Sequence, residues 1–337
     1  MGGSSVCTSF VYRTKGDNLF LSRTMDFGFT LDAKPISLPR GYTFLSDVDG
    51  TSYSGKYALI GSGKNLGKYL FADGLNEHGL ACASLYLPGE AVYSKDIESG
   101  KTNLAPHEFL LWALSFCKDI DELRDILPTV HLVDQKVELL GITPPLHWMF
   151  YDKAGNVAVI EPTDPTFKLT LKENPVGVMT NTPSLEWHFQ NLRNYLHIVP
   201  QQKTSTTFGQ FEAHPFSQSG GTLGLPGGYT PPERFVRVAY LKETIQEVDT
   251  EQEGVTNVWY VLKSVTIPKG AVIKSDGTPD LTQYTSSMCV SSLTYYFTPY
   301  GNQRITGCKL DDDFINNSST PYEWDVLQTE DILYKER

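Results

Sequence analysis

Cys7, Arg23 and Asp26 have the residue types and the spacing for nucleophilic chemistry near the start of this 337-residue chain. Cys7 follows the small segment Met-Gly-Gly-Ser-Ser-Val, and removal of residues 1–6 would give it a free α-amine beside its thiol. The ordinary pKa values of these groups are about 7.8 and about 8.5, so the amine can accept the thiol proton near neutral pH. One residue would then serve as nucleophile and general base without a histidine.

The alternative interpretation of this segment is structural. A cysteine within a strand is most often a small buried hydrophobic residue, and each of the five cysteines in the chain can be explained in that way. Residues 1–6 can equally be a remnant of cloning. Whether residues 1–6 are removed therefore distinguishes a catalytic Cys7 from a structural one.

The sequence around the cysteine predicts a β-hairpin. Residues 7–13 and 19–27 are rich in apolar and β-branched side chains, and they flank the turn residues Lys15–Asn18. In such a hairpin Cys7 lies opposite residue 24 or 25. The hairpin therefore brings the charged residues of its second strand close to the thiol.

Arg23 and Asp26 are the charged residues that this hairpin places near Cys7. A cation beside a thiol favours the thiolate, and a carboxylate can hold an α-ammonium group. The two residues have opposite strand parity, so both can face Cys7 only where the strand ends or bulges between them. We therefore expect a strand end or a bulge at this point.

Composition and motifs argue against several other function classes. The formal net charge is −11, so the phosphates of nucleic acids and of anionic membranes are repelled. We find no apolar run long enough to span a bilayer, no secretion signal and no C-x-x-C pair. The seven histidines show no metal-binding spacing. We expect a cytoplasmic protein without metal or cofactor, acting on a small molecule.

The remaining sequence predicts layers of strands and helices rather than alternating βαβ units. Helix starts are indicated by a capping box at Asp119 and by Thr-Pro-Pro-Glu from Thr230. Helices are expected at 107–117, 187–196, 230–245 and 255–265, and strands at 56–61, 69–73, 79–87, 146–151, 157–161, 167–171, 176–180, 284–290, 293–298 and 304–310. Asp73-Gly74 is interpreted as a turn, and residues 202–229 as an ordered loop beside a site.

A series of motifs in order along the chain resembles the choloylglycine hydrolase family of N-terminal-nucleophile amidases. The first two are C-T-S-F at Cys7 and R-T-M-D-F from Arg23. Later ones include D-G-L-N-E-H-G-L from Asp73, G-V-M-T-N-T-P from Gly177 and G-L-P-G-G-Y-T-P-P-E-R-F from Gly224. The family fold is α+β, a four-layer αββα sandwich of two antiparallel sheets with outer helices. The resemblance thus implies a removable segment, residues 1–6, and one catalytic domain, residues 7–337.

The resemblance also implies a role for each residue of the first motifs. Cys7 matches the nucleophile, exposed by autoproteolysis after Val6. Arg23 and Asp26 match the charged pair beside it.

Three further residues match positions of the family's active site. Asn181, in T-N-T-P, matches the asparagine whose side-chain amide serves the oxyanion hole. Arg234, in E-R-F, matches the arginine that joins this network from the first turn of a helix. Tyr86, in S-L-Y-L-P, matches the position whose backbone N–H completes the hole.

The residue at position 86 also distinguishes branches of the family. Bile salt hydrolases typically have asparagine there and penicillin V acylases tyrosine, so Tyr86 favours an acylase that cleaves a phenoxyacetyl-like amide through a Cys7 thioester. A bile salt hydrolase and an N-acyl homoserine lactone acylase are alternatives in the same class. An inactive member that binds acyl ligands is an alternative of another class. The resemblance implies a homotetramer.

Overall fold

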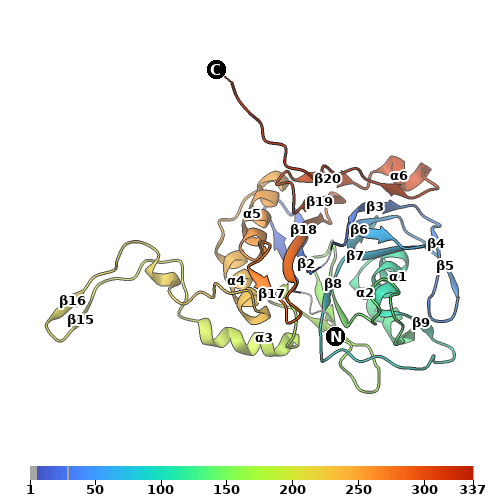
Figure 1. The fold of residues 1–337 in the computed structure, drawn as a ribbon, viewed down its shortest axis with the longest axis horizontal. Helices are drawn as coiled ribbons and strands as arrows, with labels where there is room; N and C mark the ends of the chain where they lie inside the picture. The colour runs from blue at the N-terminus through green and yellow to red at the C-terminus, as the bar shows by residue number, and fades with distance from the viewer. Residues whose placement is uncertain (1–5, 29, 337) are drawn as a thin grey trace.

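Two antiparallel β-sheets face each other between outer layers of helices in the computed structural model, which describes residues 6–28 and 30–336 (Figure 1). Helices α4 (Pro231–Thr244) and α5 (Glu251–Lys263) pack against the first sheet, and α1 (Phe109–Phe116) packs against the second. This arrangement is the α+β, four-layer αββα sandwich that the sequence predicts.

The two sheets carry the strands that surround the predicted site. In spatial order, the first sheet consists of β14 (Val178–Met179), β1 (Thr8–Arg13), β2 (Leu19–Phe27), β18 (Pro279–Cys289), β19 (Thr294–Pro299) and β20 (Thr306–Lys309), with β17 (Val272–Ile273) beside β18. The second consists of β13 (Leu171–Glu173), β12 (Val157–Ile160), β11 (Leu146–Tyr151), β8 (Ala81–Tyr86), β7 (Tyr69–Asn76), β6 (Leu59–Asn65), β3 (Lys34–Leu38) and β21 (Tyr322–Glu323).

Shorter elements connect and cover these sheets. The strands are β4 (Thr43–Leu45), β5 (Ser52–Ser54), β9 (Thr102–Leu104), β10 (Val130–Leu132), β15 (Thr206–Phe208) and β16 (Phe211–Ala213). The α-helices are α2 (Ile120–Ile126), α3 (Leu185–Leu192) and α6 (Asp312–Asn317). The 3-10 helices are η1 (Pro106–Glu108), η2 (Leu127–Thr129), η3 (Arg193–Tyr195) and η4 (Gly220–Thr222). None of the helices in the described part of the chain is long and apolar enough to cross a membrane.

The predicted N-terminal hairpin is confirmed as β1 and β2. Thr8 pairs with Thr24 across the two strands, so Cys7, one residue earlier, falls opposite Met25. Most side chains on both faces of this hairpin are buried, because helices cover one face of the sheet and the second sheet covers the other. The predicted site therefore starts inside the sandwich rather than at its surface.

The predicted helix starts at Asp119 and Thr230 are confirmed. The Asp119 side chain accepts the backbone N–H of Glu122 at the start of α2. Thr230 and Glu233 form a capping box before α4. Helix α5 starts at Glu251, earlier than the predicted residue 255, because Thr250 caps it.

The predicted turn at Asp73-Gly74 is wrong, since both residues lie inside β7. The glycines here permit close contact between strands: a Cβ atom on Gly61 of β6 would lie 2.1 Å from the carbonyl oxygen of Asp73. A turn-like dipeptide therefore marks a tight strand pairing in this protein.

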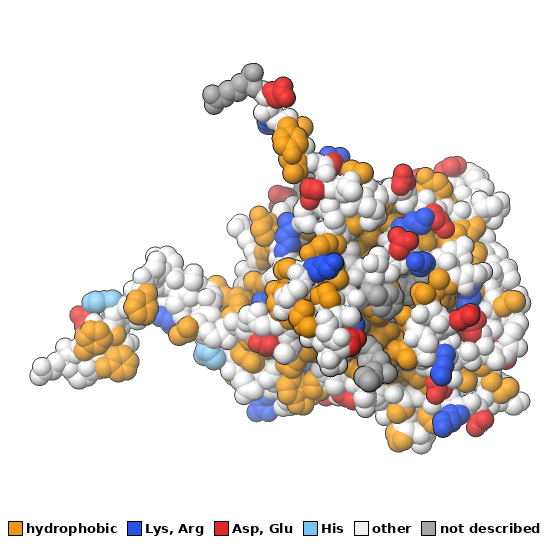
Figure 2. All heavy atoms as spheres, in the orientation of Figure 1, with side chains coloured by type: hydrophobic (Ala, Val, Ile, Leu, Met, Phe, Trp, Pro, Cys, Tyr) orange, Lys and Arg blue, Asp and Glu red, His pale blue; other side chains and the backbone are white. Residues whose placement is uncertain are grey.

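Residues 202–229 were expected to form a loop beside the site, and most of them do not. They include the β15–β16 hairpin, which extends away from the body of the molecule as an arm (Figure 1). Hydrophobic side chains gather on this arm (Figure 2), among them the exposed Phe208 and Phe211. The end of the segment, at Tyr229, returns to the site.

Candidate active site

Cys7 lies immediately before β1, at the wall of a pocket between the two sheets. Its side chain is 1% exposed, and its Sγ atom is 4.0 Å from the backbone oxygen of Asp26. Val6 precedes it in the chain. The rest of the predicted removable segment, residues 1–5, lies outside the described residues.

Arg23 connects the two sheets next to Cys7. From β2 its guanidinium group donates to the carbonyl oxygens of Ala72, at 2.9 Å, and of Ser84, at 3.0 Å, both in the second sheet. Burial lowers the pKa of Arg23, but the nearby thiol of Cys7, with Tyr284 and the carboxylate of Asp73, outweighs it and raises the pKa above its ordinary value. Arg23 is therefore a fixed positive charge beside the thiol.

Asp26 is fully buried and held by two hydroxyl groups. Thr24 Oγ1 donates to its Oδ2 at 2.9 Å, and Thr282 Oγ1 of β18 donates to Oδ1. Burial raises the pKa of Asp26 to about 6, although Arg234 and the two hydroxyl groups oppose the rise. Thr24 Oγ1 also accepts the backbone N–H of Thr8, at 3.3 Å, so this carboxylate is linked to the residue that follows the cysteine.

Arg23 and Asp26 lie on opposite faces of β2. The Arg23 side chain shares a face with Met25, whose Sδ lies 3.4 Å from Nη2, whereas Asp26 shares the other face with Thr24. Strand β2 is unbroken, so the predicted strand end between Arg23 and Asp26 is absent. An irregularity does occur at this level, in the neighbouring strand β18, where the register shifts between Thr282 and Tyr284.

Asn181 lies against the backbone of Cys7 just after β14. Its Oδ1 accepts the Cys7 N–H at 2.8 Å and Arg234 Nη2 at 2.7 Å. Because both partners are donors, this atom must be the oxygen, and Nδ2 points to the carbonyl oxygen of Tyr86 at 2.8 Å. The amide orientation is therefore fixed by the network.

Arg234 reaches the same network from the first turn of α4. Besides Asn181, its guanidinium group donates to the Cys7 carbonyl oxygen, to Thr8 Oγ1 and to the Tyr229 carbonyl oxygen. Burial lowers its pKa to about 10, opposed by Asp26 and Cys7. The capping box that starts α4 thus also places the arginine.

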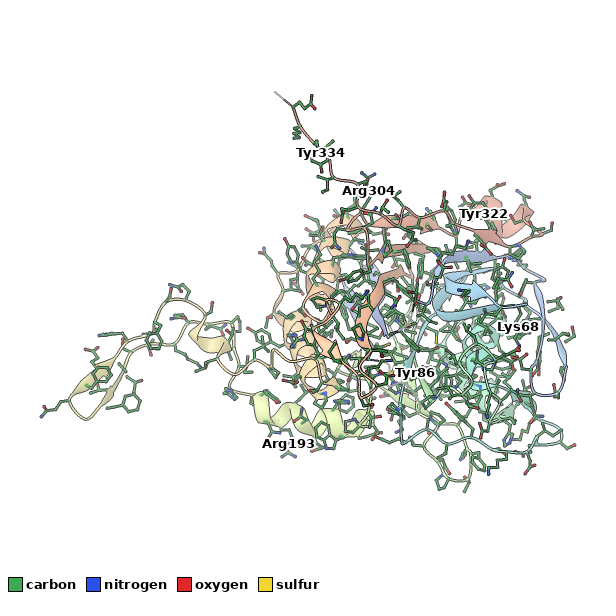
Figure 3. All side chains as sticks on the ribbon, viewed as in Figure 1. Lys68, Tyr86, Arg193, Arg304, Tyr322 and Tyr334 are labelled. Carbon is green, nitrogen blue, oxygen red and sulfur yellow. The ribbon has the colours of Figure 1, made fainter. Side chains whose placement is uncertain are left out.

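Tyr86 ends β8 next to Asn181, in the middle of the view in Figure 3. Its neighbour Leu87 donates its backbone N–H to Pro145 at 2.6 Å, on the β11 side. Successive N–H groups of a strand point to opposite sides, so the Tyr86 N–H points away from β11, on the side of its own carbonyl group. The Tyr86 N–H is therefore on the same side of the strand as the carbonyl oxygen that Asn181 Nδ2 contacts.

The pocket beside Cys7, which we call the acyl pocket, is largely apolar. It encloses about 870 Å³ including its open mouth. Apolar wall residues outside the network include Phe27, Leu66, Leu70, Phe71, Leu140 and Leu146. Tyr86 packs edge-on against Phe27, with ring centroids 5.6 Å apart. Such a pocket suits a bulky apolar group next to a reacting carbonyl.

Sequence reasoning missed the carboxylate beneath Arg23. Asp73 Oδ2 lies 3.5 Å from Arg23 Nη1 and accepts the Tyr284 hydroxyl at 2.7 Å, and Oδ1 accepts the hydroxyl of Tyr295. The signal was present, since Asp73 opens one of the family motifs, but its interpretation as a turn residue hid it. Asp73 orients Arg23 across the gap between the sheets.

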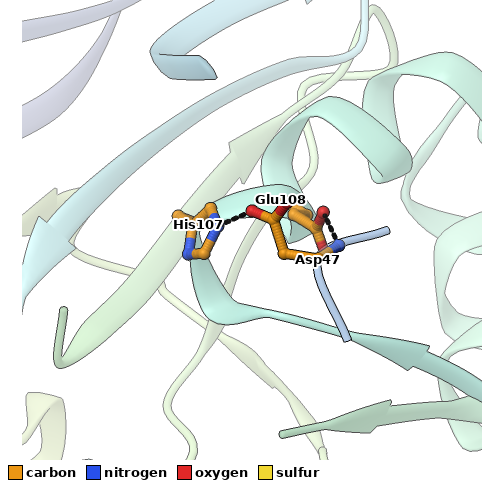
Figure 4. A group of neighbouring side chains, drawn as sticks. All are labelled: Asp47, His107 and Glu108. Atoms are coloured by element: carbon orange, nitrogen blue, oxygen red, sulfur yellow. Dashed lines mark hydrogen bonds and ion pairs between the residues drawn. The ribbon is translucent and has the colours of Figure 1, made fainter. Parts of the chain in front are cut away.

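A second polar cluster brings three possible metal ligands together. Atoms of Asp47, His107 and Glu108 lie within 4.8 Å of one another (Figure 4). The ammonium group of Lys68, labelled in Figure 3, lies 3.0 Å from Asp47 Oδ1 and also donates to Glu108. An internal cation thus already balances these carboxylates. We call these four residues the ion-pair cluster.

Comparison with known proteins adds independent findings. The family model of linear amide C–N hydrolases, choloylglycine hydrolase family, matches residues 7–322. A bile salt hydrolase/transferase of Clostridium perfringens is 32% identical over 93% of this chain and 95% of its own length. A conjugated bile acid hydrolase of Lactobacillus acidophilus is 31% identical over 93% and 99%.

Solved structures share the fold. A variant of the conjugated bile acid hydrolase from Clostridium perfringens superposes with a TM-score of 0.90 at 30% identity, covering 98% of this chain and 100% of the other. Penicillin V acylase from Agrobacterium tumefaciens gives a TM-score of 0.75 at 21% identity, covering 94% and 90%. The second likeness is one of fold alone.

Proposed function

This chain belongs to the choloylglycine hydrolase family of linear amide C–N hydrolases, and we propose that it cleaves an acyl amide through a thioester on Cys7. The observation that carries the proposal is the surroundings of this cysteine. Cys7 lines the acyl pocket, its backbone nitrogen donates to Asn181, and the family match begins at Cys7 itself.

The proposed reaction starts from a chain whose first residue is Cys7. The α-amine takes the thiol proton, and the sulfur attacks the amide carbonyl carbon. The amine then returns the proton to the leaving nitrogen as the C–N bond breaks, which leaves a thioester. Water, activated by the same amine, releases the acid and the free thiol.

Two donors would stabilise the negative oxygen that forms in each step. They are the Tyr86 N–H and Asn181 Nδ2. Tyr86 lines the acyl pocket, and Asn181 Nδ2 lies 2.8 Å from the Tyr86 carbonyl oxygen. Arg234 holds Asn181 in the required orientation. Donors already fixed before the reaction lower the barrier because they need not reorganise.

For the substrate, we propose an amino-acid conjugate of the bile salt type. The curated relatives with this specificity in their names are 31–32% identical over 93% of this chain, whereas the penicillin V acylase is 21% identical. A penicillin V-type substrate is the second candidate. It is favoured by Tyr86, whose ring forms the pocket wall with Phe27 and would suit a flat phenoxy group.

Intact mass and activity together test the proposed nucleophile. Active protein is expected to begin at Cys7, and Cys7→Ala is expected to keep residues 1–6 and to lose at least about 10⁴-fold in kcat. Cys308→Ala, a buried cysteine in β20, is the matched control and should retain activity. Full turnover by a chain that still carries Met1 would overturn the mechanism.

Parallel measurements of kcat/KM on glycocholate and penicillin V test the substrate. We expect glycocholate to be the better substrate. Tyr86→Asn keeps the backbone N–H and is expected to lower the rate on penicillin V relative to glycocholate several-fold. Faster turnover of penicillin V by the unaltered protein would favour the second candidate.

A further inference from the structure

A second cavity adjoins the acyl pocket and differs from it chemically. It encloses about 1640 Å³ including its open mouth, and we call it the outer bay. The boundary shared by the two cavities is formed by Leu66, Leu70, His107, Val137 and Leu139. Beyond this boundary, the charged side chains of Asp47, Lys68 and Lys136 line the bay. A substrate that fills the acyl pocket and continues past the leucines therefore reaches a polar wall.

Asp47 presents a fixed carboxylate to the outer bay. His107 Nε2 donates to Oδ2 at 2.8 Å, and Lys68 Nζ lies 3.0 Å from Oδ1. The Asp47 backbone N–H is held by Glu108 Oε1 at 2.8 Å. The side chain is nevertheless 42% exposed, and each carboxylate oxygen has a second lone pair. Asp47 can therefore accept a further hydrogen bond from a ligand.

His107 adds a second acceptor at the boundary. The residue is 7% exposed, and its Nδ1 has no hydrogen-bond partner among the described residues. When the ring is neutral and Nε2 donates to Asp47, Nδ1 is an acceptor. A buried polar atom without a partner costs free energy. Its position at a cavity boundary is consistent with a partner supplied by the ligand.

The charges around the outer bay determine which polar group of a ligand can bind beside Asp47. An ammonium group would be repelled by Lys68 beside Asp47 and by Lys136 on the wall, and a carboxylate by Asp47 itself and by Glu138. A neutral hydroxyl group meets neither repulsion and still satisfies an acceptor. The balance of charge therefore favours a hydroxyl.

We infer that the acyl group of the substrate is amphipathic along its length, with an apolar body in the acyl pocket and a hydroxyl at its far end donating to Asp47. This inference rests on the proposed amide hydrolysis and adds Asp47 as a specificity-determining residue. A phenoxyacetyl group ends in an apolar ring and brings no donor to the bay. A longer hydroxylated acyl group uses both cavities.

Matched pairs of N-acylglycines test the inference. Each pair consists of a straight-chain acyl group with and without a terminal hydroxyl, from octanoyl to hexadecanoyl, and glycine release gives kcat/KM. At the chain length that spans both cavities, the hydroxylated member is expected to be about tenfold better, as for a hydrogen bond to a charged acceptor. Asp47→Ala is expected to bring this ratio to one or below.

Asp49→Ala is the matched control, because it removes an exposed carboxylate from the same loop without altering the bay. It should keep the ratio of the unaltered protein. A ratio taken within one variant does not depend on how much of that variant is folded. A ratio of one or less at every chain length, or a ratio unchanged by Asp47→Ala, overturns the inference. Failure to cleave any acylglycine or glycocholate would instead count against the proposed function.

Discussion

Two polar clusters, a buried one around Cys7 and a partly exposed one around Lys68, contain similar residue types, but the pKa values of their aspartates are shifted in opposite directions. Burial raises the pKa of Asp26 to about 6. The hydrogen bond from His107, with help from Lys68, lowers the pKa of Asp47 to about 2 against the effect of burial. The ionised form of the aspartate is thus destabilised in the cluster around Cys7 and stabilised in the ion-pair cluster.

Lys68 of the ion-pair cluster and Arg234 of the cluster around Cys7 differ correspondingly. Lys68 contacts two carboxylates directly, those of Asp47 and Glu108. Arg234 donates to uncharged oxygens of Cys7, Thr8, Asn181 and Tyr229. Where a cation meets carboxylates, charge is balanced locally and the contact stabilises the fold. Where it meets uncharged groups, its charge remains available to a thiolate or an oxyanion.

The largest expected effect comes from breaking the balanced cluster. Lys68→Met leaves the Glu108 carboxylate, which is fully buried, without its cation, and removal of one partner of a buried pair typically costs about 3–5 kcal/mol. The free energy of unfolding in urea at neutral pH measures the loss. The double variant Lys68→Met, Glu108→Gln should recover part of it. A decrease in the free energy of unfolding below about 1 kcal/mol would contradict the proposed role of Lys68 in balancing the Glu108 carboxylate.

The second-largest effect is expected in the cluster around Cys7. It should lower kcat rather than the free energy of unfolding. Asn181→Ala removes one proposed oxyanion donor, and kcat is expected to fall by about 10²–10³-fold. Asn174 is a matched buried asparagine that bonds the backbone at Val178 and Gly177. Asn174→Ala should lower stability and preserve kcat. Similar kcat values for the two variants would contradict a catalytic role for Asn181 and a purely structural role for Asn174.

The smallest effects are opposite pH dependences of the two aspartates. The folded pKa of Asp26 is raised from about 3.9 to about 6, so the folded state binds the extra proton and stability falls as pH rises between these values. This contribution is at most about 3 kcal/mol, and Asp26→Asn should remove it. The pKa of Asp47 is lowered, so its contribution is present above about pH 4 and is lost as pH falls toward 2.

Urea unfolding from pH 3 to pH 7 compares Asp26→Asn, Asp47→Asn and the unaltered protein. The difference curves of the two variants should slope in opposite directions. Curves with the same sign of slope would remove the distinction between the clusters. The dependence of kcat/KM on pH should also change in Asp26→Asn, on the acidic side of the profile near pH 6.

Local sequence patterns predicted the parts of the site that depend on neighbours in the chain. Alternation and a turn predicted the hairpin that places Cys7 opposite Met25. Thr230, Pro231 and Glu233 predicted the start of α4 and thus the place of Arg234. These signals suffice because capping and hairpin formation involve residues within a few positions of one another.

Residue patterns also failed where local and tertiary demands conflict. Asp73-Gly74 has turn composition, yet the two residues lie in a strand because β6 and β7 approach closely at their glycines. Parity showed that Arg23 and Asp26 could not share one face of a regular strand. The structure resolves this by using both faces, since each face of β2 is covered by a different layer.

By itself, the sequence determined the nucleophile candidate, the hairpin, the helix caps and, through ordered motifs, the family. The tertiary structure decided which charges act on which groups. Arg23 meets Ala72 and Ser84 across the gap between sheets, and Lys68 meets Asp47 and Glu108 from the turn between β6 and β7. Such partners are far apart in sequence, and burial sets the strength of each interaction. Local sequence patterns therefore predict neither the partners nor the strength of their interactions.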